Sequence, residues 1–421
     1  MKSVAVASLA ASASALITMP PDADAAAFAI QTQGISGLGN AYAGAAAAAQ
    51  DATTVWWNPA GMAWLPPGKH FSAAAAFISP SLKFSDGGSV PAAGRPLGGG
   101  GGNAGQSALI PALFFAMDLA PAWHVGLGVN TPFGLKTEYE PTWLGRFQGI
   151  SSKLSTVNFN PSVSYRFGKT ASLGAGLNYA RGELDLLSAV NLGAAEAQNR
   201  TSLEGDAWGF NVGLLADLTA ALRVGVHYRS SLQFKLDGET TFSAPAPAAL
   251  NGKVKLDADT PDSLSFSSAY RLSDRLELLA DATWWHWGQV NRLPVIRTDG
   301  PFAGAALDTI ILDFKDTWRL SAGASRKLGG PWTLKAGVAY DETPVRGPET
   351  RTVRVPDSDR YWFTTGLRYQ RSARAFDAGY AFIKARNADI NSDQTSLNRG
   401  IVRGTYKASV HTFGVQYQHS F

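Results

Sequence analysis

The 421-residue sequence lacks cysteine, lacks any run of lysine or arginine, and lacks a long hydrophobic segment after its first 25 residues. The absence of cysteine excludes disulfides, Cys-ligated metal sites and thiol nucleophiles, but it says nothing about the compartment. The 37 basic and 33 acidic residues leave a formal charge of only +4, so we expect no nucleic-acid partner. Because no later stretch is apolar enough for a transmembrane helix, the chain can span a membrane only as a closed β-barrel.

Residues 1–25 have the pattern of a secretory signal peptide. Lys2 precedes the apolar run 4–19, and residues 23–25 form a small-x-small cleavage site. The apolar run is shorter than the ~20 residues that a membrane-spanning helix requires. The sequence therefore predicts export and a mature chain that begins near Ala26.

Residues 26–67 are rich in glycine and alanine and do not alternate in polarity as strands do. The segment 34–44 contains four glycines and leads into five alanines at 45–49, which predicts a turn and one short helix. Asn58 at an N-cap position and Pro59 at the first helical position predict a second helix. A segment of small residues ahead of a long β region suits a plug packed inside a hollow structure.

From Phe71 onward, apolar and polar residues alternate in segments of about ten or more residues. In 157–167 the odd positions are apolar or aromatic and the even positions are polar, and 413–421 follows the same rule. The segment 222–229 alternates too, with its apolar residues at the even positions. In a soluble sandwich the apolar face would be the core. In a membrane barrel it faces lipid and the polar face lines the lumen.

The connections between these segments decide between a sandwich and a barrel. Strands are expected at about 70–84, 107–118, 122–133, 154–167, 171–186, 203–218, 221–237, 260–272, 275–287, 310–328, 332–343, 359–371, 374–386 and 404–421. Tight turns are expected at 120–121, 168–170, 219–220, 273–274, 329–330 and 372–373, and the other connections at about 15 to 25 residues. Short turns at one end and long loops at the other are typical of outer-membrane barrels, whereas a sandwich has no reason to separate them. The sequence thus predicts an all-β, fourteen-stranded, antiparallel transmembrane barrel over 68–421, with 26–67 as a small helical hatch in its lumen.

Aromatic residues at predicted strand ends support a membrane location. They occur at 284–287, at 361–363 and at Trp123, where large rings would meet the lipid headgroups. Packing of these rings against one another is the alternative. The terminal Phe421, with apolar or aromatic residues at every second position before it, resembles the end that the barrel assembly machinery recognises.

Five motifs occur in order along the chain: Gly-Ile-Ser-Gly-Leu-Gly-Asn-Ala-Tyr-Ala-Gly at 34–44, Asn-Pro-Ala at 58–60, Phe-Lys-Asp at 314–316, Ala-Tyr-Asp-Glu-Thr-Pro-Val at 339–345, and Val-Pro-Asp-Ser-Asp-Arg-Tyr-Trp at 355–362. Together they resemble the FadL family of outer-membrane transporters for long-chain fatty acids and other hydrophobic compounds. The resemblance spans nearly the whole mature chain. It implies a monomer in the Gram-negative outer membrane, in contact with lipid and lipopolysaccharide.

The resemblance also suggests where the hatch opens and where cargo leaves. Asn58, Pro59 and Ala60 would hold the hatch closed, although starting a helix explains the first two residues equally well. In the family the third strand is kinked inward and leaves a lateral gap. The corresponding stretch here contains Asn130, Pro132, Phe133 and Gly134. These residues either form the kink, because proline and glycine interrupt strand pairing, or simply mark the end of the strand.

A carboxylate cargo requires a basic residue beside an apolar pocket. Lys315 and Arg319 are expected to face inward, opposite an apolar face made by Leu312, Phe314, Trp318 and Leu320. The Phe-Lys-Asp motif suggests Lys315 as the partner of the carboxylate, while an ion pair with Asp313 or Asp316 is the alternative.

Arg181 resembles a second ligand position of the family. It shares a face with Leu173, Leu177 and Tyr179, so it is expected to look outward. Unless a bulge resets the register, or Arg181 stands above the bilayer, it fails as a ligand.

The predicted external loops 187–202 and 238–259 are rich in Ala, Leu and Pro, and the family resemblance makes them the place of first capture. The function that follows is passive, ligand-gated uptake of long-chain fatty acids, without a cofactor. Uncharged, toluene-like aromatic hydrocarbons are the alternative cargo, and a structural barrel with a fixed plug is a third interpretation.

His227 and His286 belong to no recognisable Ser/His motif, so no enzymatic activity is expected.

Overall fold

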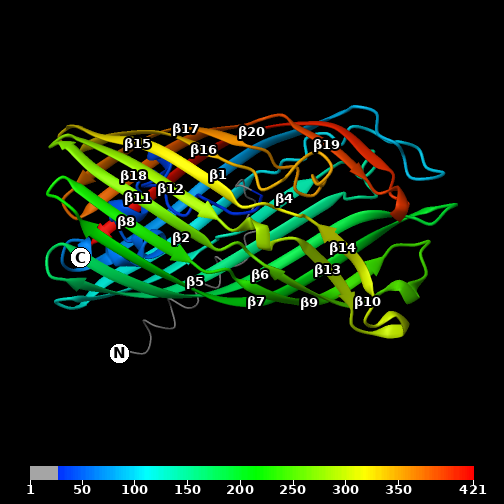
Figure 1. Ribbon diagram of the computed structural model, residues 1–421, viewed down its shortest axis with the longest axis horizontal. Coiled ribbons are helices and arrows are strands. Elements are labelled where there is room, and N and C mark those ends of the chain that lie inside the picture. The colour runs from blue at the N-terminus through cyan, green and yellow to red at the C-terminus, as the bar shows by residue number, and fades with distance from the viewer. Residues whose placement is uncertain (1–26) are drawn as a thin grey trace.

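The computed structural model describes residues 27–421 (Figure 1). The predicted signal peptide lies outside the described residues and stays a prediction. Within 27–421, no helix has the length and apolar character needed to cross a membrane.

The described residues form one closed antiparallel barrel around a small helical hatch. The strands are β1 (Lys69–Asp86), β2 (Ala108–Ala120), β3 (Trp123–Asn130), β4 (Gly134–Glu138), β5 (Ser151–Phe167), β6 (Ala171–Asn191), β7 (Glu196–Asp217), β8 (Leu222–Arg229), β9 (Gln233–Phe242), β10 (Gly252–Asp259), β11 (Ser263–Ser273), β12 (Leu276–Trp285), β13 (Arg292–Arg297), β14 (Ala306–Ile311), β15 (Thr317–Gly329), β16 (Trp332–Asp341), β17 (Arg360–Arg371), β18 (Arg374–Ala385), β19 (Ala388–Asp393) and β20 (Ile401–Ser420).

These twenty segments of residues 27–421 combine into fourteen barrel strands, because six strands are interrupted. The interrupted strands are β3/β4, β8/β9, β10/β11, β12/β13, β14/β15 and β18/β19. β1 pairs with β20 from His70↔Ser420 to Asp86↔Gly404, which closes the barrel. The predicted fourteen-stranded antiparallel barrel is confirmed.

Short turns lie at one end of the barrel, which we call the turn end, and longer connections lie at the other, the loop end (Figure 1). All six predicted tight turns occur within one or two residues of their expected positions. The expected length of about 15 to 25 residues holds for the external connections 87–107 and 342–359, but the other five external connections are shorter. β6 and β7 are joined by residues 192–195 alone, and β9 and β10 by 243–251, so the predicted loops 187–202 and 238–259 consist mostly of paired strand.

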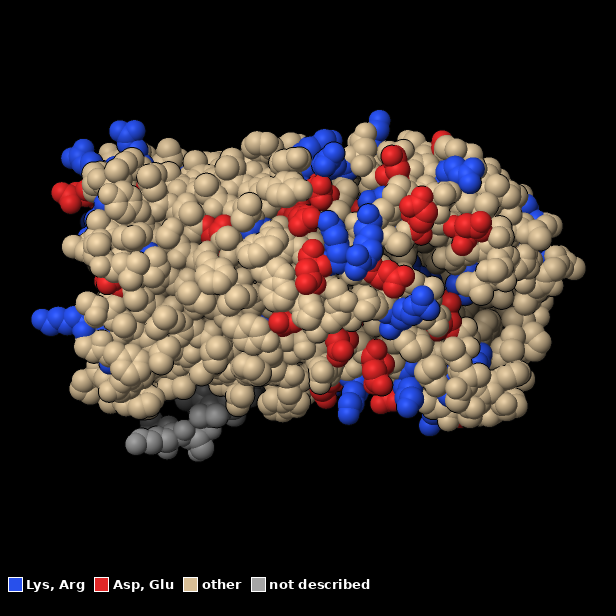
Figure 2. Space-filling view, in the orientation of Figure 1, with Lys and Arg blue, Asp and Glu red and all other residues tan. Residues whose placement is uncertain are grey.

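The two faces of the long strands exchange their polarity along the barrel. β6 and β7 pair without a register shift, so each position keeps its side of the wall. Toward the turn end Leu177 is exposed on the outer face and Asn178 is buried on the inner face; toward the loop end Arg181 is outside and Leu186 inside. Figure 2 shows charged side chains gathered toward the loop end, beside a nearly uncharged belt. The uncharged belt is suited to contact with lipid. In the loop-end half the outer face is suited to contact with water, and the interior is apolar.

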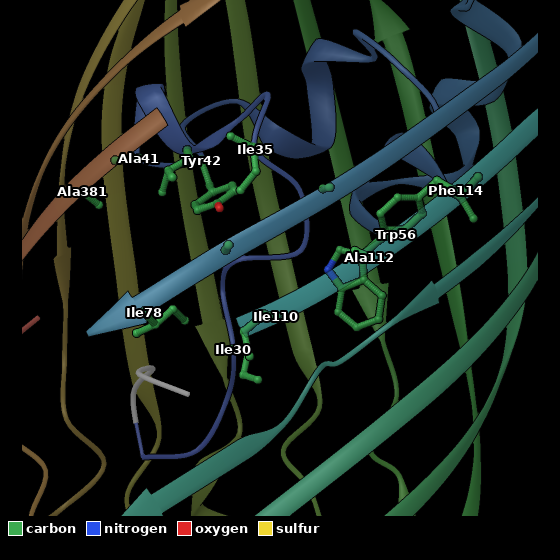
Figure 3. Packing of buried hydrophobic residues seen from close by; sticks show 14 of the residues in the cluster. Ile30, Ile35, Ala41, Tyr42, Trp56, Ile78, Ile110, Ala112, Phe114 and Ala381 are labelled. Carbon is green, nitrogen blue, oxygen red and sulfur yellow. The ribbon is translucent and has the colours of Figure 1, made fainter. Parts of the chain in front are cut away.

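The hatch fills the lumen near the turn end. It contains four single-turn elements, η1 (Leu38–Asn40), α2 (Ala45–Ala48), α3 (Thr54–Trp57) and η2 (Pro59–Trp64), rather than the two helices expected. Its apolar residues pack against inward-facing residues of β1 and β2 (Figure 3). Close approach to the wall requires glycine: a Cβ on Gly39 would lie 2.7 Å from the Cα of Gly366. The hatch therefore fits this barrel by backbone contact, which limits its helices to short pieces.

The aromatic prediction holds in part. Trp123, Tyr361 and Phe363 are exposed on the outer face, as expected for rings at a lipid boundary. Trp287 and Trp362 are buried in the lumen instead. Trp287 turns inward because the strand is interrupted after β12 by η4 (Trp287–Gln289), and Trp362 occupies an inward position of β17. The remaining short helices are η3 (Ala248–Leu250), η5 (Gly300–Phe302) and η6 (Thr395–Leu397), all at the loop end.

Candidate functional site

A cavity with a nearly continuous apolar wall, which we call the apolar cavity, lies in the lumen on the loop side of the hatch. It is lined by Phe28, Phe133, Leu135, Ser152, Leu154, Thr156, Gly182, Leu184, Leu186, Phe234, Leu236, Leu256, Ala258, Asp259, Thr260, Leu293, Ile310, Leu312, Arg354 and Val355. The space open to the centres of water-sized groups is ≈ 90 Å³, several times the ~10–15 Å³ that one water needs. An apolar cavity of this kind binds hydrophobic ligands in preference to water.

A second cavity lies beside the first, next to the interruption between β3 and β4. Its lining includes residues 80–82 of β1, Gly105 and residues 135–137 of β4. Leu135 and Val355 line both cavities, so these side chains separate them. The chain between Ala27, which lines the second cavity, and Phe28, which lines the apolar cavity, passes along the same boundary.

Residues 27–33, the N-terminal segment, cover the interruption of the third barrel strand from inside. The Ile30 N–H donates to the Pro132 carbonyl over 2.8 Å, and the Gly134 N–H donates to the Phe28 carbonyl over 2.9 Å. Farther along the segment, Asn130 Nδ2 donates to Gln33 Oε1 over 2.6 Å. Proline cannot donate to a neighbouring strand, so the segment satisfies backbone groups that the wall leaves free.

The wall itself has a gap at this place. The β2–β3 ladder begins at Leu113↔Val129, and β4 forms a ladder with β5 alone. On its other side β4 has the isolated bridge Gly105↔Thr137. The backbone of residues 131–133 turns inward, where Thr156 Oγ1 accepts from the Phe133 N–H over 3.0 Å and donates to its carbonyl over 2.6 Å. The structure thus places Asn130, Pro132, Phe133 and Gly134 in an inward kink beside the apolar cavity.

Asn58 joins the hatch to the barrel wall. Its Oδ1 accepts from the Ala60 N–H over 3.1 Å and caps η2, where Pro59 is the first residue. Its Nδ2 donates to the carbonyls of Ala46, over 2.8 Å, and of Leu214 in β7, over 3.0 Å. The same side chain therefore both caps η2 and joins α2 to the wall strand β7.

Arg319 faces inward as expected but contacts the hatch rather than the apolar cavity. Its Nη2 donates to the Ala41 carbonyl over 2.8 Å, and its guanidinium lies 5.3 Å from the centre of the Trp362 ring. Lys335 acts in a similar way, since it donates to the Ser36 carbonyl over 2.6 Å. These cations hold the hatch in place and do not line the cavity.

Lys315 lies in the break between β14 and β15, where it forms an ion pair with Glu342. The expected common face is wrong: Phe314 and Leu312 are buried in the lumen, whereas Trp318 is exposed outside. The reason is local, because Asp313 adopts a left-handed conformation with φ of 45° and resets the alternation. Lys315 is absent from the residues that line the apolar cavity, and its partner is neither of the two aspartates expected.

Arg181 lies on the outer face of β6, at the start of the charged half of the barrel. Its Nη2 donates to Glu204 Oε2 over 2.8 Å, and half of its side chain is exposed. The β6–β7 ladder contains no bulge that would turn it inward. The structure therefore keeps Arg181 apart from the cavity and from Lys315.

Sequence reasoning missed Arg354, which belongs to the long connection 342–359 between β16 and β17. This connection folds back into the lumen, and Arg354 is 9% exposed at the wall of the apolar cavity. Its Nη1 donates to the Ser151 carbonyl and to Ser152 Oγ over 3.0 and 2.9 Å. Burial lowers the pKa of the guanidinium to about 10, so it stays protonated at neutral pH. The one available signal was its place between Val353 and Val355 in an otherwise polar stretch.

Comparisons with known proteins agree with this architecture. Residues 16–421 match the family described as "Outer membrane protein transport protein (OMPP1/FadL/TodX)". Outer membrane protein P1 of Haemophilus influenzae is 28% identical over 466 residues, covering 97% of this chain and 98% of that protein. The long-chain fatty acid transport protein of Escherichia coli is 27% identical over 432 residues, covering 92% of each.

Solved structures give the same fold. A FadL homologue of Pseudomonas aeruginosa superposes with a TM-score of 0.87 at 24% identity, covering 94% of this chain and 100% of the other. The toluene transporter TbuX of Ralstonia pickettii superposes with a TM-score of 0.69 at 20% identity, covering 90% and 96%.

Proposed function

Because the chain belongs to the OMPP1/FadL/TodX family of outer membrane transport proteins, we propose that it takes up long-chain fatty acids by passive, ligand-gated diffusion. The chain is a β-barrel of the Gram-negative outer membrane that transports hydrophobic compounds, and it is a transport protein rather than an enzyme. The finer assignment concerns the cargo and its route.

The observation that carries the proposal is the apolar cavity in the half of the barrel that stands outside the lipid belt. Its lining comes from seven wall strands as well as from Phe28 and Val355, so a large part of the barrel wall contributes to one apolar cavity. An acyl chain gains roughly 0.8 kcal/mol for each CH₂ removed from water. The relatives named for long-chain fatty acid transport support the same cargo.

Entry is proposed from the loop end along the inner faces of β9, β10 and β13. Leu236, Val254, Leu256 and Val295 are buried there and share one cluster with Phe28 and Phe133. Capture therefore uses the inward faces of these extended strands, in place of the apolar surface loops suggested by the sequence.

Exit is proposed through the gap between β2 and β4. A complete barrel wall resists opening because every strand pair is joined by hydrogen bonds, and this gap lacks such a ladder. Leu109 of β2 and Phe77 of β1, near the gap, are exposed on the outer face, which suits contact with lipid. Cargo in the apolar cavity would displace the N-terminal segment from residues 130–134 and leave sideways.

The hatch blocks the direct route to the turn end, and we propose that Asn58, Pro59 and Ala60 control its position. Asn58 holds both α2 and β7, while Ser172 Oγ of β6 donates to the Ala60 carbonyl over 2.8 Å. Rearrangement of these contacts would shift the plug without unfolding the wall.

Partners of the folded barrel are also proposals. The exposed side chains of Phe413, Val415 and Phe421 on β20 and at its end suit recognition by the barrel assembly machinery. Lipid and lipopolysaccharide would surround a single barrel, since β1 closes on β20 within the same chain.

The experiment is uptake by an Escherichia coli strain that lacks its own long-chain fatty acid transport protein. Cells that carry this chain should grow on oleate as sole carbon source and accumulate labelled oleate, whereas cells with the empty vector should not. Uncharged aromatic hydrocarbons are the second candidate, because the cavity wall is almost wholly apolar and would also accept them. Faster entry of toluene without any growth on oleate would favour that cargo. If the cells show neither growth on oleate nor faster entry of toluene, the remaining interpretation is a barrel with a fixed plug.

A further inference from the structure

Arg354 is a buried cation that forms no ion pair in the part of the chain that the structure describes. Asp308 acts on its charge and opposes the lowering of its pKa by burial, but Asp308 is itself paired with Arg399 over 3.1 Å. Its side chain lines the apolar cavity, and Nη1 makes its hydrogen bonds to uncharged groups of Ser151 and Ser152. Within residues 27–421, its Nε and Nη2 make no hydrogen bond and no carboxylate forms an ion pair with it. The other charged residue of the cavity lining, Asp259, is exposed.

Lys315, Arg360 and Arg319 differ, because protein groups already neutralise or cover them. Lys315 pairs with Glu342 and Arg360 with Asp357. Arg319 lies against Trp362 and the Ala41 carbonyl. A buried charge costs free energy unless it is paired. The unpaired charge of Arg354 therefore needs an explanation, whereas the charges of these other residues do not.

We propose that Arg354 binds the carboxylate of a long-chain monocarboxylic acid whose tail lies in the apolar cavity. The inference rests on the proposed function and specifies the head-group contact. The free Nε–H and Nη2–H of a guanidinium point the same way and match the two oxygens of a carboxylate. The tail then contacts Leu154, Leu184 and Phe234, which line the same cavity.

The position of Arg354 also links binding to exit. Val355, its neighbour in the chain, separates the apolar cavity from the second cavity beside the gap. The Thr137 hydroxyl of β4 donates to the Arg354 carbonyl over 3.3 Å. A carboxylate held at this residue therefore places its acyl chain within reach of β4 and the inward kink.

The test measures binding to the full chain in lipid nanodiscs, with oleate and its uncharged counterpart oleyl alcohol as probes. Arg354→Met keeps the length of the side chain and removes the charge, Arg354→Lys keeps the charge, and Lys315→Met is the matched control. We expect Arg354→Met to weaken oleate binding by 10-fold to 100-fold and to leave oleyl alcohol within 2-fold. Arg354→Lys should recover part of the loss, and Lys315→Met should change neither ligand by more than 2-fold.

Thermal unfolding separates this role from a merely structural one. If Arg354 only supported the connection 342–359, Arg354→Met would lower the Tm and weaken both probes alike, and that result would overturn the inference. An uncompensated cation predicts an unchanged or higher Tm for Arg354→Met, because a neutral residue replaces a buried charge.

The failure of the two proposals can be told apart. If wild-type protein binds oleyl alcohol and oleate equally well, and Arg354→Met alters neither, the head-group contact is overturned while hydrophobic cargo stands. If wild-type protein binds neither probe but binds toluene, the fatty-acid function itself is overturned, and the inference with it. Loss of oleate binding in Lys315→Met with full binding in Arg354→Met would transfer the carboxylate to Lys315.

Discussion

The Nδ2 atom of Asn58 lies 3.0 Å from the carbonyl oxygen of Leu214, so one amide side chain fastens the hatch to the wall of the barrel. Asn58→Ala removes this bond, the bond to Ala46 and the cap of η2. Losing buried hydrogen bonds costs about 1–3 kcal/mol for each group left unsatisfied. We expect the backbone amides of residues 45–64 to exchange faster in Asn58→Ala than in the wild type, as measured by hydrogen–deuterium exchange.

The control for Asn58→Ala is Asn251→Ala at the loop end, where the amide oxygen accepts from the exposed Phe242 N–H. This variant should leave exchange in the hatch unchanged, because water can replace the lost acceptor. Equal protection of the hatch in Asn58→Ala and wild type would mean that the plug is held by its apolar packing alone.

Gly39 should tolerate no side chain. A Cβ at this position would lie 2.7 Å from the Gly366 Cα and 2.8 Å from its nitrogen, both backbone atoms, so neither neighbour can turn away. Gly39→Ala is expected to lower stability by about 1–3 kcal/mol, the usual cost of overpacking, seen as a lower Tm in detergent. Gly99→Ala is the matched control, since no atom lies within 4 Å of its added Cβ; similar Tm values for both variants would argue against tight hatch packing.

Thr156 holds the kink of the third strand through two hydrogen bonds to Phe133. Thr156→Val preserves shape but removes both, so residues 131–134 should exchange amide hydrogens at least 10-fold faster while the Tm falls by only a few degrees. Thr201→Val removes a comparable buried hydroxyl between β7 and β9 and should not affect the kink. Unchanged exchange at 131–134 would show that the N-terminal segment suffices to hold it.

The barrel could be predicted from sequence because lipid and lumen impose opposite polarity on the two faces of each strand. Segments such as 157–167 carry this signal strongly, and the tight turns mark the ends. The loop-end half carries a different signal. There the inner face is apolar and the outer face charged, as at Leu186 and Arg181, and the strands continue where a membrane rule predicts loops.

The candidate site was less predictable because it depends on irregular backbone. The left-handed conformation of Asp313 moves Phe314 inward and takes Lys315 away from the cavity, and alternation alone cannot place such a residue. Arg354 belongs to a connection that folds into the lumen, so neither strand parity nor a polar surface loop describes it. Long-range packing decides both positions.

The pH dependence of oleate binding is the last prediction, and its sign follows from the pKa of Arg354. Burial lowers that pKa from 12.5 to about 10, so the side chain is a cation below pH 10 and loses its charge as the pH rises through that value. If Arg354 holds the carboxylate, affinity for oleate stays level between about pH 7 and 9 and falls above about 10, while affinity for oleyl alcohol stays constant. In Arg354→Met the fall above pH 10 should vanish, because the group that titrates is gone. The same fall in Arg354→Met as in wild type would assign the titration to another residue, and the carboxylate would then need a different partner.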